Sequence, residues 1–234
     1  MEKPTRQAKV HRLLCIKGLV DNHPYPALND LDRKLIARLN RRDGFFIECG
    51  ANNGHLQSNT FALEYQYGWR GILIEAIPDL ARLCAFLRLG AEVYNCALVA
   101  EGFAGETVTM RFAGLKSLVR GCKQAEVEEQ WVTSGIRNES LGETYAVEVH
   151  ARTLNSILDD ERPERIDLFS LDVEGYELEV LKGLDLDRHR PEFILVEAHD
   201  PAAIGSHLAP WYDLEAELTP GWDFLYRARR PLGA

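Results

Sequence analysis

The chain has 234 residues, and its 36 acidic against 27 basic side chains give a formal net charge of −9. A chain of this length can bury a core without disulfides or structural metals, and it fits one α/β domain. The negative charge argues against a nucleic-acid backbone or an anionic membrane surface as the main partner.

Cysteine usage and hydropathy both favour an intracellular setting. The five cysteines are scattered along the chain and form no Cys-x-x-Cys pair, which is typical of a reducing compartment. No uninterrupted apolar run is long enough to cross a bilayer, and no signal-peptide pattern opens the chain. We therefore expect a cytoplasmic protein with no membrane span and no nucleic-acid partner.

The first half of the chain predicts a parallel sheet. Apolar periodicity predicts a helical N-terminal segment over 1–42, with helices at 10–20 and after Asn29 or Asp30. A buried strand at Phe45–Cys49 then enters a turn bounded by glycines. After the turn, helices and strands alternate at residues 58–67, 71–75, 78–89 and 92–98. This order predicts parallel strands joined by right-handed crossovers.

The middle of the chain follows a different pattern. Residues 107–112 and 145–151 alternate between apolar and polar side chains, as edge or antiparallel strands do, and 124–135 read as a polar helix. We take 102–150 as an insertion into the sheet fold. Insertions at a ligand-facing edge often form substrate walls or lids.

The buried-strand pattern resumes in the last third. We expect strands at 166–172 and 192–197, helices at 153–158 and 174–183, a weak helix at 211–218 and a final strand at 222–226. No repeat or low-complexity linker interrupts the chain. The sequence therefore predicts one α/β domain over 1–234, with a Rossmann-like, mostly parallel sheet flanked by helices.

Polar side chains gather where the predicted strands end. They stand at 48–54, at Glu75, at 172–174 and at 197–199, while the strands themselves are nearly apolar. In open α/β sheets, ligands bind beyond the carboxyl ends of the strands, and buried polar groups are costly unless paired. A binding site is one interpretation. The other is that these acids favour the positive ends of the helices that follow them.

The glycine-bounded turn helps to choose the ligand. Its glycines, Gly50 and Gly54, lack the tight Gly-x-Gly of the dinucleotide fingerprint, and Glu48 would repel a pyrophosphate. S-adenosyl-L-methionine (SAM) has an ammonium, a sulfonium and a ribose diol but no phosphate. Glu48 can support its methionine end, Glu75 can accept both ribose hydroxyls, and residues 95–97 can line its adenine. A nicotinamide dehydrogenase remains the alternative.

Five stretches occur in an order and spacing that is more specific than any one of them. They are FIECGANNG at 46–54, SNT at 58–60, GWRGILIE at 68–75, TL at 153–154 and IDLFSLDVEGYE at 166–177. In these stretches the chain resembles the FkbM family of class I SAM-dependent methyltransferases. The resemblance implies a Rossmann-like sheet with a variable cap, SAM as cofactor, and O-methylation of a hydroxyl on a sugar, polysaccharide or natural product.

Two other functions stay open beside O-methylation. One is a non-catalytic SAM-fold binding protein, and the other is an N-methyltransferase acting on a small molecule or peptide. The expected partner is a small-molecule or saccharide substrate, and a homodimer is not excluded. The candidate cofactor-binding residues are Glu48, Gly50, Ala51, Asn52, Asn53, Gly54, Ser58, Asn59, Glu75, Ala76, Cys96, Ala97 and Asp172.

The chain departs from the family pattern at two positions. Many members carry a lysine two residues before the aspartate of the fourth strand, and this chain has Ser170. The role of that lysine is therefore not carried over. The glutamate of the second strand is commonly followed by proline, whereas Glu75 is followed by Ala76. The ribose-binding acid itself is retained.

Methyl transfer to a hydroxyl also needs a group that takes the proton. His199 is the first candidate for this general base, because histidine titrates near neutral pH, and Asp172 is the second. Together with Glu197, and with Glu174 beside them, these side chains are also candidate ligands for a divalent cation such as Mg²⁺, since hard cations favour oxygen ligands. No short ligand motif in the sequence supports this metal site.

Overall fold

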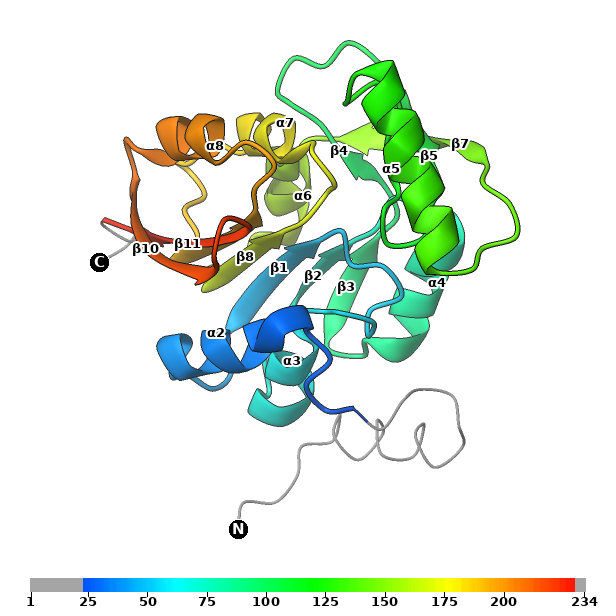
Figure 1. The fold of residues 1–234 in the computed structure, drawn as a ribbon. Helices are drawn as coiled ribbons and strands as arrows, with labels where there is room; N and C mark the ends of the chain where they lie inside the picture. Colours follow the sequence, from blue (N-terminus) through cyan, green and yellow to red (C-terminus); the bar gives the residue numbers. More distant parts are fainter. Residues whose placement is uncertain (1–22, 230–234) are drawn as a thin grey trace.

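A computed structural model describes residues 23–229 of the chain. Its main feature is a seven-stranded sheet of order β10-β11-β9-β8-β1-β2-β3 (Figure 1). The strands are β1 (Phe45–Cys49), β2 (Arg70–Ile74), β3 (Ala91–Tyr94), β8 (Leu168–Leu171), β9 (Phe193–Glu197), β10 (Tyr212–Thr219) and β11 (Asp223–Ala228).

The strand directions create one binding edge. The five strands β1, β2, β3, β8 and β9 run parallel to their neighbours, whereas β11 is antiparallel to both β9 and β10. From β1 the chain moves outward through β2 and β3, then returns to place β8 on the other side of β1. The strand order therefore reverses beside β1, and a ligand site is expected there. This is the Rossmann-like fold predicted from the sequence.

Helices cover both faces of the sheet (Figure 1). The helices α2 (Leu31–Leu39), α3 (Phe61–Tyr67) and α4 (Pro78–Leu87) share one apolar cluster with alternate strand residues. The helices α6 (Leu154–Glu161), α7 (Glu177–Lys182) and α8 (Pro201–Leu208) share another with the opposite residues of the same strands. Phe46 packs on the first face and Ile47 on the second, as the two-residue period of a strand requires.

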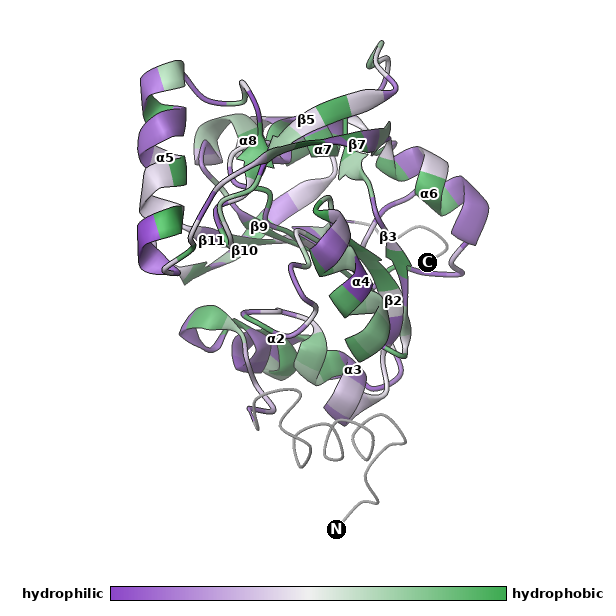
Figure 2. Cartoon of the chain, turned by 90° about the vertical axis from the view of Figure 1, so that its right-hand side faces the viewer, coloured by the Kyte–Doolittle hydropathy of each residue, from purple (hydrophilic) through white to green (hydrophobic). Residues whose placement is uncertain are grey.

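Residues 97–152 form a second sheet with a helix beside it, which we call the cap. Its four-stranded sheet has the order β4-β7-β5-β6, and helix α5 (Ala125–Asn138) lies against it. The cap strands are β4 (Ala97–Leu98), β5 (Thr107–Arg111), β6 (Leu118–Val119) and β7 (Ala146–Arg152). Hydrophobic residues concentrate in the strands, whereas α5 shows hydrophilic and hydrophobic residues in turn (Figure 2). Apolar residues such as Val132 attach α5 to the cap.

Several predicted elements differ from the structure. The helix predicted at 211–218 is wrong, because this segment is strand β10, joined to β11 by a turn at 220–222. The strand predicted at 92–98 is divided between β3 and β4, which belong to two sheets. Helix α8 was not expected, although Asp200 accepts a hydrogen bond at its start and Pro201 opens it.

The N-terminal end is described only in part. The helix predicted at 10–20 lies outside the described residues. Within the described residues, the short 3₁₀ helix η1 (Leu28–Asp30) and α2 precede β1. The helix expected to start at residue 58 begins at Phe61. Between residues 23 and 229, no helix combines the length and the apolar character that a membrane span needs.

Candidate active site

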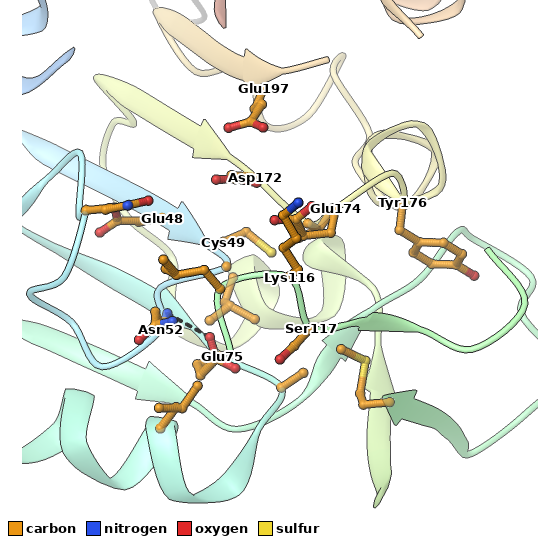
Figure 3. A pocket seen from close by; sticks show the side chains of 18 of the residues that line it. Glu48, Cys49, Asn52, Glu75, Lys116, Ser117, Asp172, Glu174, Tyr176 and Glu197 are labelled. Carbon is orange, nitrogen blue, oxygen red and sulfur yellow. Dashed lines mark hydrogen bonds between the residues drawn. The ribbon is translucent and has the colours of Figure 1, made fainter. Parts of the chain in front are cut away.

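A cavity of about 390 Å³ opens at the carboxyl ends of β1, β2, β8 and β9 (Figure 3). This volume lies within the range of small-molecule sites. Six carboxyl groups line it, and they belong to Glu48, Glu75, Glu139, Asp172, Glu174 and Glu197. The cavity is therefore built from strand ends and roofed by the cap, which contributes Glu139.

The turn after β1 is shaped by its contacts with the rest of the protein. Gly50 has a φ of +82°, and a Cβ there would lie 1.8 Å from the carbonyl oxygen of Asp172. A Cβ on Gly54 would meet Arg88 at 2.8 Å and the backbone of Cys84 at 3.2 Å. The space that a side chain would occupy at these two glycines is thus filled by other atoms of the protein. Their first effect is to let β1 pack against β8 and α4.

Glu48 is held by a buried network. Its side chain accepts hydrogen bonds from the Ser58 hydroxyl at 2.8 Å, the Thr60 hydroxyl at 2.6 Å and the Asn59 backbone N–H at 2.8 Å. The Arg88 guanidinium lies 3.4 Å from it and also pairs with Glu64 at 2.7 Å. These contacts fix the turn that follows β1. The role of Glu48 toward the cofactor's ammonium stays a prediction.

Glu75 at the end of β2 faces the turn. Its two carboxylate oxygens accept the backbone N–H groups of Asn52 at 2.7 Å and Ile77 at 2.8 Å (Figure 3). Each oxygen keeps a second lone pair, because a carboxylate offers about four acceptor positions. Burial raises the pKa of Glu75 to about 7, against an ordinary value of 4.5. Its position and free lone pairs suit a vicinal diol.

A second group of acids lies at the ends of β8 and β9. Burial, together with the charge of Asp223, raises the pKa of Glu197, and the charge of Glu197 acts in turn on Asp172. Burial, together with the charges of Glu197 and Glu174, raises the pKa of Asp172 well above its ordinary value. Its Oδ1 atom is buried without a hydrogen-bond partner. Burial therefore favours the protonated form of each of these two carboxyl groups.

Glu174 follows in the turn after β8. Its φ of +58° is unusual for a residue other than glycine, and Gly175 follows at +104°. The Trp131 indole N–H from α5 donates to Glu174 Oε2 at 3.0 Å. Burial and the charge of Glu197 raise the pKa of Glu174 to about 7. The strained turn and the indole together hold this carboxyl group at the cavity wall.

Comparison with known proteins identifies the family of the chain. The family model described as the methyltransferase FkbM domain matches residues 48–219, which include every strand-end acid of the cavity. The chain belongs to the FkbM methyltransferase family. This membership implies SAM as the cofactor. No curated protein matches the chain.

Two solved structures are similar to this chain at low sequence identity. A TehB-like SAM-dependent methyltransferase from Corynebacterium glutamicum is 12% identical, with a TM-score of 0.41, and the match covers 95% of this chain and 96% of that one. The human methyltransferase 10 domain containing protein is 13% identical, with a TM-score of 0.47, covering 95% of this chain and 93% of that one.

Most of the predicted cofactor residues of this FkbM domain line the cavity. Those that do are Glu48, Gly50, Asn52, Ser58, Asn59, Glu75, Ala76, Cys96, Ala97 and Asp172. Ala51, Asn53 and Gly54 are not among the lining residues, and Asn53 instead accepts the N–H groups of His55 and Leu56 within the turn. The Asn95 side chain donates to the carbonyl groups of Glu75 and Ala76, which orders the backbone beside the expected adenine position.

The two candidate bases occupy different places. Asp172 lines the cavity, whereas His199 is not among the lining residues. The His199 ring packs against Trp131 with ring centres 5.4 Å apart, and its nitrogens lie 3.9 Å from Glu174 and 3.6 Å from Glu177. His199 is therefore next to Glu174, which lines the cavity, but does not line the cavity itself. Its role as general base stays a prediction.

The candidate metal ligands do not form a recognisable metal site. Within residues 23–229, no group of three or more His, Cys, Asp or Glu side chains has an arrangement that could hold a metal ion. Ser170, at the position where many FkbM proteins carry a lysine, accepts a hydrogen bond from the Asn59 side chain at 3.1 Å. It thus ties β8 to the segment after the glycine turn.

Sequence reasoning missed the cap and N-terminal residues that reach the cavity. Loop 113–117 is held by Glu139, which accepts the Leu115 N–H at 2.5 Å, and the loop places Lys116 at the cavity, where its Nζ donates to Ser134 at 2.8 Å. On another side Leu28 lines the cavity, and the adjacent Ala27 forms a β-bridge with Gln57. The alternating pattern of the insertion indicated strands but not which loop would face the site.

Proposed function

We propose that the protein transfers the methyl group of SAM to a hydroxyl of a sugar, polysaccharide or natural-product acceptor. The observation that carries the proposal is the shared cavity. One end holds Glu75 with acceptor positions free for a ribose diol, and the other holds Asp172 with a buried, unpartnered oxygen. A cofactor site and a proton acceptor thus face one enclosed space beneath the cap.

The cofactor is expected to lie along the first two strands. Glu75 would accept both ribose hydroxyls, Gly50 and Asn52 would border the methionine end, and Cys96 and Ala97 would border the adenine. Lys116 is the one lysine or arginine among the described residues that line the cavity, and it donates a hydrogen bond to Ser134.

The transfer step is an in-line displacement. The acceptor oxygen forms a bond to the methyl carbon while the carbon–sulfur bond breaks, and the sulfur keeps the bonding electrons as neutral S-adenosylhomocysteine (SAH). The hydroxyl proton passes to the carboxyl pair of Asp172 and Glu197. Alignment of the reacting atoms beneath the cap supplies much of the rate, because positioning can contribute several kcal/mol.

His199 has a supporting role in this proposal. Its nearest carboxyl groups, Glu174 and Glu177, lie between it and the reacting centre. A protonated His199 would stabilise the ionised forms of Glu174 and Glu177 beside the carboxyl pair that takes the proton. The carboxyl pair lines the cavity directly and is the group we place next to the acceptor.

Calorimetry with SAH and with NAD tests the first part of the proposal. Tight SAH binding without NAD binding is expected, and the reverse would favour a nicotinamide dehydrogenase. Consumption of SAM with a saccharide mixture then separates an enzyme from a non-catalytic SAM-binding protein, since both bind SAH. Mass spectrometry and NMR of the product distinguish an O-methyl from an N-methyl group. Adding EDTA and then Mg²⁺ tests the metal requirement.

A further inference from the structure

Residues 23–30 form a segment, which we call the N-terminal strap, that borders the cavity and belongs to neither sheet. Figure 1 shows the strap in dark blue below the strand ends, whereas the cap helix α5 lies above them. Leu28 of the strap lines the cavity and is nevertheless 52% exposed. An apolar side chain that borders an open cavity becomes buried when a ligand fills the cavity, and this burial is favourable.

The backbone conformation turns Leu28 away from the core. Leu28, Leu31 and Leu35 have the spacing of one helix face, and Leu31 and Leu35 are buried in the core. Asn29 and Asp30 interrupt the helix with φ values of +53° and +55°. Such left-handed conformations are uncommon in residues other than glycine, and they cluster at ligand sites. They separate Leu28 from the buried face and leave it at the cavity.

Polar contacts hold the strap in this position. His55 Nε2 lies 3.2 Å from the His23 carbonyl oxygen, and Ala27 forms a β-bridge with Gln57. The buried carboxyl group of Asp32 accepts the Ala27 N–H at 3.3 Å. The residue after Ala27 is thus presented to the cavity from a backbone that is already ordered, which lowers the entropy cost of binding a ligand.

The strap lies nearer to the methionine end of the expected cofactor than to its adenine end. Ala27 contacts Gln57, and the next residues, 58–59, donate hydrogen bonds to Glu48 at the end of β1. Glu48 is the acid that we expect at the methionine end. The residues expected beside the adenine, 96–97, come after β3, and β2 separates β3 from β1 in the sheet.

We propose that Leu28 packs against the carbon chain of the cofactor's methionine part and so completes the cofactor site from the side of the strap. This inference rests on the proposed methyltransferase function and adds a binding residue to it. The methylene groups between the α-carbon and the sulfur of SAM offer the apolar surface that a leucine side chain can cover. The charged groups of the methionine part are left to the polar residues of the turn after β1.

Substitution of Leu28 tests the contact, and Leu56 provides a matched control. Leu56 is also an exposed leucine, at 43%, but it is not among the lining residues. Calorimetry should show SAH affinity falling by about fivefold to tenfold in Leu28→Ala and staying within about twofold of wild type in Leu56→Ala. Leu28→Met should lose less than Leu28→Ala, because methionine keeps an apolar chain of similar volume.

Three outcomes of this titration are decisive. Unchanged SAH affinity in Leu28→Ala, or an equal loss in Leu56→Ala, would overturn the inference. Failure of the wild-type protein to bind SAH would instead reject the proposed function. Thermal unfolding without ligand checks that each variant folds.

5′-Methylthioadenosine tests where along the cofactor Leu28 lies, because it keeps the adenine, the ribose and the sulfur but lacks the amino-acid part. Displacement of SAH gives its affinity where direct titration is too weak. Leu28→Ala should leave this affinity within about twofold of wild type, so the ratio of SAH to methylthioadenosine affinity should fall by about fivefold to tenfold. Equal losses for both ligands would place Leu28 at the nucleoside and contradict the assignment.

Discussion

At the scale of single residues, the acids of the cavity differ in chemistry because their partners differ. Glu48 pairs with Arg88 and accepts three hydrogen bonds. Glu75 receives two backbone N–H groups and keeps lone pairs for a ligand. Asp172 keeps a buried oxygen without a partner. In the proposed mechanism the same functional group thus holds a turn at Glu48, binds the cofactor at Glu75 and takes a proton at Asp172.

Replacement of Glu75 tests the ribose contact. Glu75→Gln should weaken SAH binding by about tenfold to a hundredfold, because hydrogen bonds to a charged group contribute about 1.5–3 kcal/mol. Calorimetry gives the affinity, and thermal unfolding without ligand checks that the variant folds. SAH affinity within about twofold of wild type would show that Glu75 does not hold the ribose.

The two candidate bases predict different kinetics. Asp172→Asn should lower kcat by about a hundredfold or more, as loss of general-base catalysis does, whereas His199→Gln should lower it by less than about tenfold. SAH affinity measured in parallel separates chemistry from cofactor binding. A larger kcat loss in His199→Gln than in Asp172→Asn would return the base role to the histidine.

At the scale of elements, the turn after β1 and the cap determine the shape of the site. The turn joins β1 to β8 through the close approach of Gly50 to the Asp172 backbone. The cap closes the cavity from above, and Glu139 fixes the position of loop 113–117. The close packing of Gly50 against Asp172 should determine stability. The position of loop 113–117, which Glu139 fixes, should determine acceptor binding.

Substitution of Gly50 separates packing from backbone strain. Gly50→Ala should lower the free energy of unfolding by about 2–4 kcal/mol, because its Cβ would clash with Asp172 in addition to adopting a positive φ. Gly102→Ala has a similar φ of +78° but open space around it, so about 1 kcal/mol is expected. Urea unfolding measures both. Equal losses would mean that the contact with Asp172 contributes nothing.

Loss of the contact that holds loop 113–117 should weaken acceptor binding and leave cofactor binding unchanged. Glu139→Ala removes the acceptor of the Leu115 N–H, so we expect the KM for the acceptor to rise severalfold while SAH affinity stays within about twofold of wild type. Glu126→Ala on the exposed side of α5 is the control. A loss of SAH affinity equal to the rise in KM would place the loop at the cofactor instead.

The sequence predicts the sheet better than it predicts the cap, and the reason is physical. The strands β1, β2, β8 and β9 are buried on both faces, so their apolar runs stand out locally. The edge strand β10 mixes exposed Leu214 with acids, which allowed a helix to be predicted there. Whether Lys116 lines the cavity, and where His199 lies, depends on the path of the loops and on the direction of each side chain. No local pattern encodes either.

At the scale of the whole molecule, burial of acids connects stability to pH. The pKa values of Glu75 and Glu174 are raised to about 7 from 4.5, and the pKa of Asp172 is also raised. The folded protein therefore keeps these protons over a range in which the unfolded chain has lost them. The free energy of unfolding must fall as pH rises through that range, and this contribution levels off above it.

Unfolding across pH checks this linkage. Thermal or urea unfolding should show lower stability at about pH 8 than at about pH 5.5. The double variant Glu75→Gln, Glu174→Gln should show a smaller decrease, because its amides do not titrate. A decrease of equal size in the double variant would assign the effect to other groups, and stability that rises over this range would contradict the sign.

The β-bridge between Ala27 and Gln57 bears on how the protein should be produced. Expression from residue 31 onward would leave every strand of the seven-stranded sheet intact and yet remove Leu28 from the cavity wall. Such a shortened protein could fold normally and still bind its ligands poorly. An activity screen on it would report a false negative for the whole enzyme, so the residues before α2 belong in any expressed form.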